Sequence, residues 1–164
     1  MCLICTRIEM IKNNTNPWFV RELETGYVVI GDKQYFPGYC LFLCKWHETE
    51  LHYLDKEKRA KFLMEMSIVA DAAQIAFKAD KMNYELLGNG DNHLHWHLFP
   101  RRHGDLLKDG IDYGTNGIGP VWWIPWNIMN HEKYKVSGEE LEKMKADLRT
   151  ALDVVMANHE YSSK

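Results

Sequence analysis

Three histidines recur at alternate positions in the stretch DNHLHWHLFPRR, residues 91–102. Large apolar residues separate His93, His95 and His97, and in a strand such alternation sends the two sets of side chains to opposite faces. One face would then pack on the core while the other presents three imidazoles. Three interpretations compete: a metal site, a row of catalytic bases, or the polar face of an ordinary strand.

The spacing favours catalysis over a metal that all three histidines would hold. Zinc takes nitrogen ligands at about 2.0–2.1 Å, whereas three alternate strand residues extend over about 13 Å of backbone. Imidazole titrates near neutrality, so a neutral and nucleophilic fraction exists at physiological pH. A histidine that attacks phosphorus needs an acceptor for its other ring nitrogen and donors for the phosphate charge, which flanking histidines and backbone can supply. The row therefore favours covalent phosphorus chemistry.

The motif resembles the signature of the histidine triad (HIT) family of nucleotide hydrolases and transferases, in which apolar residues follow each histidine. The segment FPGYCLFLCKWH, residues 36–47, resembles the family's Pro-Gly-His-x-Leu-Val-x-Pro-Lys-x-His, and the likeness extends over about residues 2–125. The resemblance implies that His95 attacks the α-phosphorus of a nucleotide and that water then hydrolyses the nucleotidyl-histidine, with no metal required for the chemical step. His97 would contact the phosphate or the leaving group, and His93 would help to position the row.

The resemblance also implies substrate contacts outside the row. Asn89 matches the family's Asn or Gln near the α-phosphate, with a turn residue as the alternative interpretation. Asp32 would bind ribose hydroxyls like the family's strand-end acid, or serve only in a turn. Tyr39 stands where the family often has a fourth histidine, and a phenol stays neutral at pH 7. The stretch GDN before the motif is shorter than the family's loop, which leaves the choice of leaving group open.

A second group of residues suggests a structural zinc site. Cys2 and Cys5 have the Cys-x-x-Cys spacing of zinc sites, with two ordinary buried thiols as the alternative. Several bacterial HIT proteins begin with a similar pair, and by that resemblance the ligands would be Cys2, Cys5, His47 and His93. Such a Cys₂His₂ set has no open position, so the zinc would be structural rather than catalytic.

Composition limits the class of protein. The 164 residues fit one domain, 46% of them are hydrophobic, and the formal net charge is −3, which is ordinary for a soluble globular protein. This charge gives no basic stripe for duplex nucleic acid, and no run approaches the roughly 18 apolar residues of a membrane span. The N-terminal residues lack the pattern of a secretory signal, so a cytoplasmic location is expected.

Periodicity predicts the elements that must position the row. The pattern indicates an antiparallel α+β fold over residues 1–164, with a long helix and a C-terminal helix. The resemblance implies that the sheet is HIT-like, with the long helix packed on it. A tight GDN turn is expected to join two strands into a hairpin that contains the motif. A capping box of Ser137 and Glu140 predicts the start of the last helix. Strands are predicted at 18–23, 27–30, 39–45, 84–89 and 93–99, and helices at 55–79 and about 137–158.

The expected function is a nucleotide phosphohydrolase or transferase. Its substrates would be dinucleoside polyphosphates or AMP derivatives such as phosphoramidates, and the resemblance implies a homodimer. Two alternatives stay open. One is a nucleotide-binding regulatory module with little turnover, which Tyr39 and the short GDN stretch favour. The other is a zinc-dependent hydrolase in which the histidine row itself holds the catalytic metal.

Overall fold

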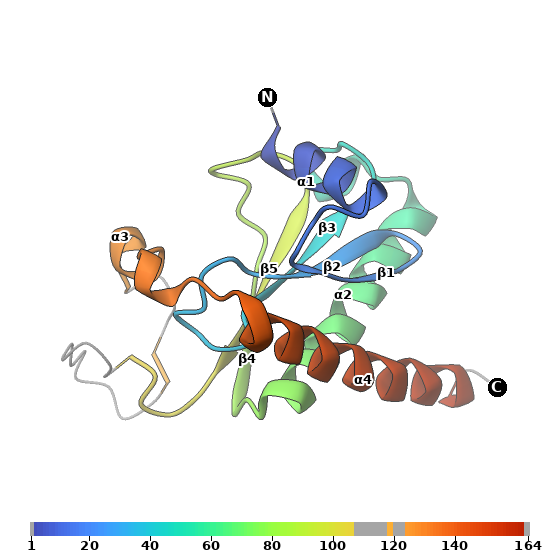
Figure 1. Cartoon of the computed structure of the whole chain (residues 1–164). Helices are drawn as coiled ribbons and strands as arrows, with labels where there is room; N and C mark the ends of the chain where they lie inside the picture. The colour runs from blue at the N-terminus through green and yellow to red at the C-terminus, as the bar shows by residue number, and fades with distance from the viewer. Residues whose placement is uncertain (1, 107–117, 120–123, 163–164) are drawn as a thin grey trace.

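The chain folds into a five-stranded antiparallel sheet in the order β1-β2-β3-β5-β4, with helices on both sides (Figure 1). The computed structural model describes residues 2–106, 118–119 and 124–162. This arrangement confirms the predicted α+β class. In chain order the elements are α1 Leu3–Lys12, β1 Phe19–Glu22, β2 Gly26–Ile30, β3 Cys40–Cys44, η1 Leu51–Tyr53, α2 Lys56–Phe77, β4 Lys81–Glu85, β5 His95–Arg101, α3 Trp126–Met129, η4 Glu132–Tyr134 and α4 Gly138–Ser162.

The strand register assigns the two faces of the sheet. Leu43 pairs with His95 and Leu41 with His97, so these four side chains share one face, here called the triad face. The opposite face packs against α2 and α4, and its residue Leu98 is fully buried in the main core. One strand therefore serves the core and the histidine row at once, as the alternation predicts.

Helix α1 covers part of the triad face (Figure 1). Ile4, Ile8 and Ile11 recur along one side of the helix and pack on Val29 and Leu43 of the sheet. Sequence analysis did not identify this helix, although the spacing of its isoleucines is a helical signal. Its position matters because α1 carries both cysteines of the N-terminal pair.

The predicted tight hairpin at GDN is wrong. Glu85 pairs with His97, so β4 ends at Glu85 and residues 86–94 form a longer connection. The side chain of Asp91 accepts hydrogen bonds from the His93 backbone amide and from amides at the start of α1, including that of Ile4. These bonds hold the connection against α1 instead of letting it close a tight turn. His93 therefore precedes the strand, and only His95 and His97 lie within it.

The buried side of helix α2 contains core residues and one carboxylate. Asp55 caps its start by accepting from the Lys58 amide. Phe62 and Val69 are buried, whereas Leu63, which helical spacing predicts to face the core, is only half-buried. Buried Glu65 was not foreseen: its carboxylate accepts hydrogen bonds from the backbone amides of the turn at residues 24–25. The helix thus stabilises the β1–β2 turn as well as the core.

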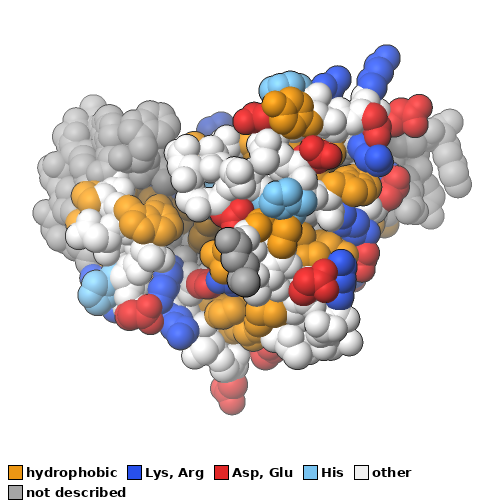
Figure 2. Space-filling model, turned by 90° about the horizontal axis from the view of Figure 1, so that it is seen from above, with side chains coloured by type: hydrophobic (Ala, Val, Ile, Leu, Met, Phe, Trp, Pro, Cys, Tyr) orange, Lys and Arg blue, Asp and Glu red, His pale blue; other side chains and the backbone are white. Residues whose placement is uncertain are grey.

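Helix α4 confirms the predicted C-terminal helix. Leu141, Leu148, Leu152 and Val155 are buried against the main core. Within the described residues, no helix combines the length and hydrophobicity needed to cross a bilayer. Figure 2 looks onto the molecule from above, and on this side acidic and basic side chains are interspersed rather than gathered into separate fields.

Candidate functional site

The hydrogen bonds of His95 and His97 determine where their protons lie. His95 Nδ1 is 2.6 Å from the backbone oxygen of His93, and His95 Nε2 is 3.0 Å from His97 Nε2. A carbonyl oxygen can only accept, so His95 carries its proton on Nδ1 and keeps a lone pair on Nε2. His97 must then donate from Nε2, which leaves its Nδ1 as an acceptor. The Nε2 lone pair of His95 is therefore the acceptor in its hydrogen bond with His97.

Tyr39 completes this chain of hydrogen bonds. Its hydroxyl lies 2.6 Å from His97 Nδ1, and because that nitrogen is an acceptor, the phenol donates. Burial raises the pKa of Tyr39 well above its ordinary value, so the donor proton is retained. The ring stacks on Phe99 with centroids 4.5 Å apart. A Cβ at Gly31 would come within 2.2 Å of this ring, so the glycine makes room for it.

His97 is held in its neutral form. Burial and the neighbouring His95 lower the pKa of His97 to about 4. At pH 7 the imidazole therefore donates a hydrogen bond without carrying a positive charge. This keeps the lone pair of His95 available, because a protonated neighbour would bind it more tightly.

The lowered pKa of His97 makes stability depend on pH. The unfolded histidine takes up a proton near pH 6.5, whereas the folded one resists until about pH 4. The contribution is therefore complete above pH 6.5 and is lost as pH falls towards 4, by about 3 kcal/mol in the free energy of unfolding. Urea titrations of wild type and His97→Gln at pH 7 and 4.5 measure it. We expect a clearly smaller acid loss in the variant; equal losses would contradict the assigned pKa.

Two further residues, Asp32 and Asn89, were predicted to contact the substrate. Asp32 is ion-paired with Arg7, whereas Asn89 is exposed. Both carboxylate oxygens of Asp32 are bound by the Arg7 guanidinium of α1, at 2.9 and 2.5 Å. A ribose that used Asp32 would have to share it with Arg7. Asn89 is exposed in the 86–94 connection rather than at the end of a strand, because β4 stops at Glu85.

A cavity of about 150 Å³ lies beside His95. His93 and His95 line it on the sheet side, and Glu50, His52 and Asn92 line it from the two flanking connections. Sequence analysis did not assign a role to the last three, because no spacing pattern links them to the histidine row. Their meeting follows from the fold, in which the connections after β3 and before β5 lie side by side.

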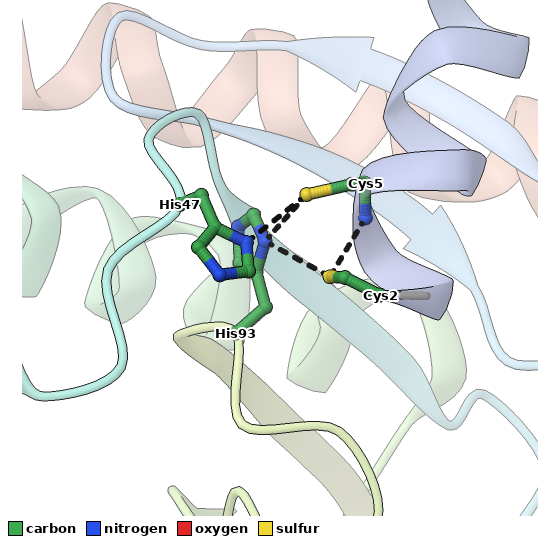
Figure 3. A group of neighbouring side chains, drawn as sticks. All are labelled: Cys2, Cys5, His47 and His93. Atoms are coloured by element: carbon green, nitrogen blue, oxygen red, sulfur yellow. Dashed lines mark hydrogen bonds between the residues drawn. The ribbon is translucent and has the colours of Figure 1, made fainter.

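The four predicted zinc ligands converge (Figure 3). Cys2 and Cys5 come from the start of α1, His47 from the connection after β3, and His93 from the segment before β5, and their ligand atoms all lie within 4.8 Å of one another. Cys5 Sγ is 3.1 Å from His47 Nδ1 and 3.4 Å from His93 Nδ1. Tetrahedral zinc separates its ligands by about 3.3–3.8 Å, so the four residues fit the ion.

His93 is oriented for metal binding by its other nitrogen. Its Nε2 lies 2.9 Å from the backbone oxygen of Cys44, which can only accept, so Nε2 carries the proton and Nδ1 presents a lone pair to the sulfurs. Burial lowers the pKa of His93, which also favours the neutral form. His93 thus belongs with the cysteines by its side chain and with His95 by its backbone oxygen.

Asp91 ties the N-terminal helix to this region. Its carboxylate accepts from the backbone amides of Leu3, Ile4 and His93 and from the Cys2 thiol. Burial tends to raise the pKa of Asp91, but these hydrogen bonds outweigh it and lower the pKa below its ordinary value. A negative charge at the start of α1 also interacts favourably with the helix dipole. Asp91, in the GDN stretch before the motif, therefore holds α1 and His93 together.

The chain is similar to a known protein family and to several solved structures. The model of the HIT domain family matches residues 17–104. A histidine triad protein from Bradyrhizobium japonicum is 24% identical with a TM-score of 0.63, over 82% of this chain and 89% of its own. A hypothetical histidine triad nucleotide-binding protein from Sulfolobus tokodaii is 19% identical with a TM-score of 0.66, over 92% and 93% of the two chains. These likenesses confirm the predicted HIT-like fold.

A further solved structure bears on the cysteine–histidine cluster. A zinc-bound histidine triad family protein from Mycobacterium smegmatis is 19% identical with a TM-score of 0.62, and the likeness covers 96% of each chain. A comparison with curated proteins found no match.

Proposed function

Because the chain belongs to the HIT domain family, we propose that it is a nucleotide hydrolase or transferase that works through a covalent nucleotidyl-histidine at His95. Family membership supports nucleotide binding or hydrolase-type activity in general. The observation that carries the finer proposal is the placement of the protons on the row. His95 Nε2 is unprotonated, and its lone pair accepts a hydrogen bond from His97 Nε2, 3.0 Å away.

The proposed reaction has two steps. His95 Nε2 attacks the α-phosphorus, the bond to the leaving group breaks, and the backbone oxygen of His93 stabilises the positive charge that develops on the His95 ring. His97 is released from His95 as the new bond forms, so that its Nε2 proton can donate to a phosphate oxygen. Water then attacks the nucleotidyl-histidine and releases the nucleoside monophosphate. Dinucleoside polyphosphates and phosphoramidates of AMP both contain the required bond.

Two alternatives are weaker. A catalytic metal held by all three histidines of the row would need His93 as a ligand, yet His93 presents Nδ1 to Cys2 and Cys5 and Nε2 to the backbone oxygen of Cys44. Zinc, where bound, would supply a structural cross-link between α1 and the strand, through Cys2, Cys5, His47 and His93. A binding module with little turnover was suggested by Tyr39. The phenol nevertheless donates to His97, which supports a working row.

The proposal is tested by turnover of two substrates. Adenosine 5′-phosphoramidate and diadenosine tetraphosphate are incubated with the protein, with and without a chelator, at a temperature where circular dichroism shows the zinc-free chain to be folded. We expect release of AMP from at least one substrate at a rate that the chelator does not change. Binding without release of AMP would support the regulatory module instead. Turnover that the chelator stops and zinc restores would support the zinc hydrolase.

Tyr39→Phe is expected to lower kcat by about 10- to 100-fold with little change in KM. The ring remains, but the buried His97 Nδ1 loses its donor, a loss of roughly 1–3 kcal/mol, and the proton on His97 is no longer fixed on Nε2. Steady-state kinetics measures this, with Tyr84→Phe on the opposite face of β4 as the control. In Tyr39→His, an imidazole N–H can replace the phenol as the donor to His97 Nδ1, so this variant should recover activity. Unchanged kcat in Tyr39→Phe would contradict the role of the phenol.

A further inference from the structure

Glu85 is a carboxylic acid on the triad face that lies next to the histidine row. It ends the edge strand β4 and pairs directly with His97 on β5. Directly paired residues share a face, and their Cβ atoms lie about 4.5–5.5 Å apart. Register therefore places the carboxyl group beside His97, on the side away from β3.

The surroundings of Glu85 neither neutralise its charge nor leave it fully in water. The side chain is half-buried, and within the described part of the chain it has no ion-pair partner. Burial raises the pKa of Glu85, and Arg101 on β5 offsets part of this shift. Arg101 is already bound by the carboxylate of Asp105 and the amide oxygen of Asn83. Among the residues that the structure describes, the titratable groups that interact with Glu85 are His97, its partner in the register, together with Tyr39 and Arg101.

The row by itself lacks an acid for a poor leaving group. His97 is neutral at pH 7, because its pKa is about 4. A neutral imidazole can donate a hydrogen bond, but it is far too weak an acid to transfer a proton to a departing amine or alkoxide. Tyr39 is also committed, since its hydroxyl donates to His97. Of the acidic side chains on the described strands, Glu85 is paired with the row by register.

We propose that Glu85 is a further catalytic residue, whose carboxyl group contacts the leaving group beside His97 and protonates its bridging atom as the bond to phosphorus breaks. The inference rests on the proposed function. In the first step the His95 Nε2–P bond forms, the bond from phosphorus to the leaving group breaks, and the carboxyl proton moves to the leaving atom. In the second step the carboxylate takes a proton from the attacking water, the Nε2–P bond breaks, and the acid is regenerated. An anionic substrate nearby favours the protonated carboxyl group.

The test uses two substrates with the same nucleotide and different leaving groups. Adenosine 5′-phosphoramidate needs a proton on its leaving nitrogen, whereas the p-nitrophenyl ester of AMP releases a stable anion without one. For Glu85→Gln we expect kcat/KM to fall on the order of 10²–10⁴-fold for the phosphoramidate and by less than about threefold for the ester. Glu57→Gln, an exposed glutamate at the start of α2, serves as the charge-matched control and should match wild type on both.

The pH profile gives a second readout. For the phosphoramidate, wild-type kcat/KM should decline on the alkaline side as Glu85 loses its proton, and this decline should be absent in Glu85→Gln. Equal losses on both substrates would assign Glu85 a structural role and overturn the inference, and so would wild-type rates on the phosphoramidate. Either result leaves the proposed function intact as long as turnover of the ester depends on His95. Turnover that survives in His95→Ala would instead overturn the proposed function, and with it this inference.

Discussion

His95→Ala is expected to lower kcat for hydrolysis of a nucleotide phosphoramidate on the order of 10⁶-fold, the scale seen when a covalent nucleophile is removed. The variant loses the unprotonated Nε2 that would attack phosphorus, while the supporting contact between Tyr39 and His97 remains. Because the nucleophile itself is missing, substrate binding should change far less than turnover. Single-turnover kinetics and equilibrium binding of AMP measure the two effects separately.

A smaller side chain at the same position gives a positive test. His95→Gly leaves a space lined by His93 and the cavity beside it, and added imidazole should occupy that space and restore part of the activity. His103→Ala is the matched control, because His103 is an exposed histidine that pairs with Asp80 beyond the end of β5. Substantial turnover in His95→Ala without imidazole, or equal loss in His103→Ala, would contradict the role of His95.

Removing zinc, or one of its ligands, is expected to produce the largest change in stability. A metal that binds only the folded chain and is present at 1,000 times its Kd adds about 4 kcal/mol to the free energy of unfolding. For a chain of this size that corresponds to a fall of roughly 10 °C in Tm. Wild type should bind one zinc per chain and lose this Tm increment in chelator, whereas Cys5→Ala should bind none and should not respond to chelator.

Cys40→Ala separates metal binding from the general effect of losing a thiol. Cys40 is fully buried in the main core, away from the cluster at α1. The variant should be less stable than wild type but should still bind one zinc per chain by elemental analysis. Absence of zinc from wild-type protein purified without chelator, or retention of zinc by Cys5→Ala, would contradict the site.

The cluster and the nucleophile share one residue, and this links stability to catalysis. His93 presents Nδ1 to Cys2 and Cys5, and its backbone oxygen accepts from His95 Nδ1. Asp91 holds the same segment through the His93 amide. Contacts that fix His93 therefore also fix the acceptor that keeps the His95 proton on Nδ1.

The histidine row and the zinc ligands could be predicted because their signals lie in short, regular spacings. Alternation within HLHWHLF is sufficient to place His95 and His97 on one face, and the structure confirms that Leu98 lies on the other. The Cys-x-x-Cys pair and His47 lie far apart in the chain, and only the family resemblance connected them. The structure brings them together with His93.

The features that were missed depend on the strand register. A one-turn hairpin at GDN would have placed Asn89 beside the row, whereas the observed pairing of Glu85 with His97 puts Glu85 there. The reason is the side chain of Asp91, which bonds to α1 amides far away in sequence. Buried Glu65 is a similar case, since its partners belong to the turn at residues 24–25. Such long-range polar contacts leave no periodic signal in the sequence.

The stereochemical course at phosphorus tests the covalent mechanism most directly. A nucleotide phosphoramidate made chiral at phosphorus with oxygen isotopes is hydrolysed by the wild-type protein, and the configuration of the AMP product is determined by nuclear magnetic resonance. Attack by His95 followed by attack of water gives two in-line displacements, so the mechanism predicts overall retention. Overall inversion would show a single displacement by water and would contradict a nucleotidyl-histidine intermediate.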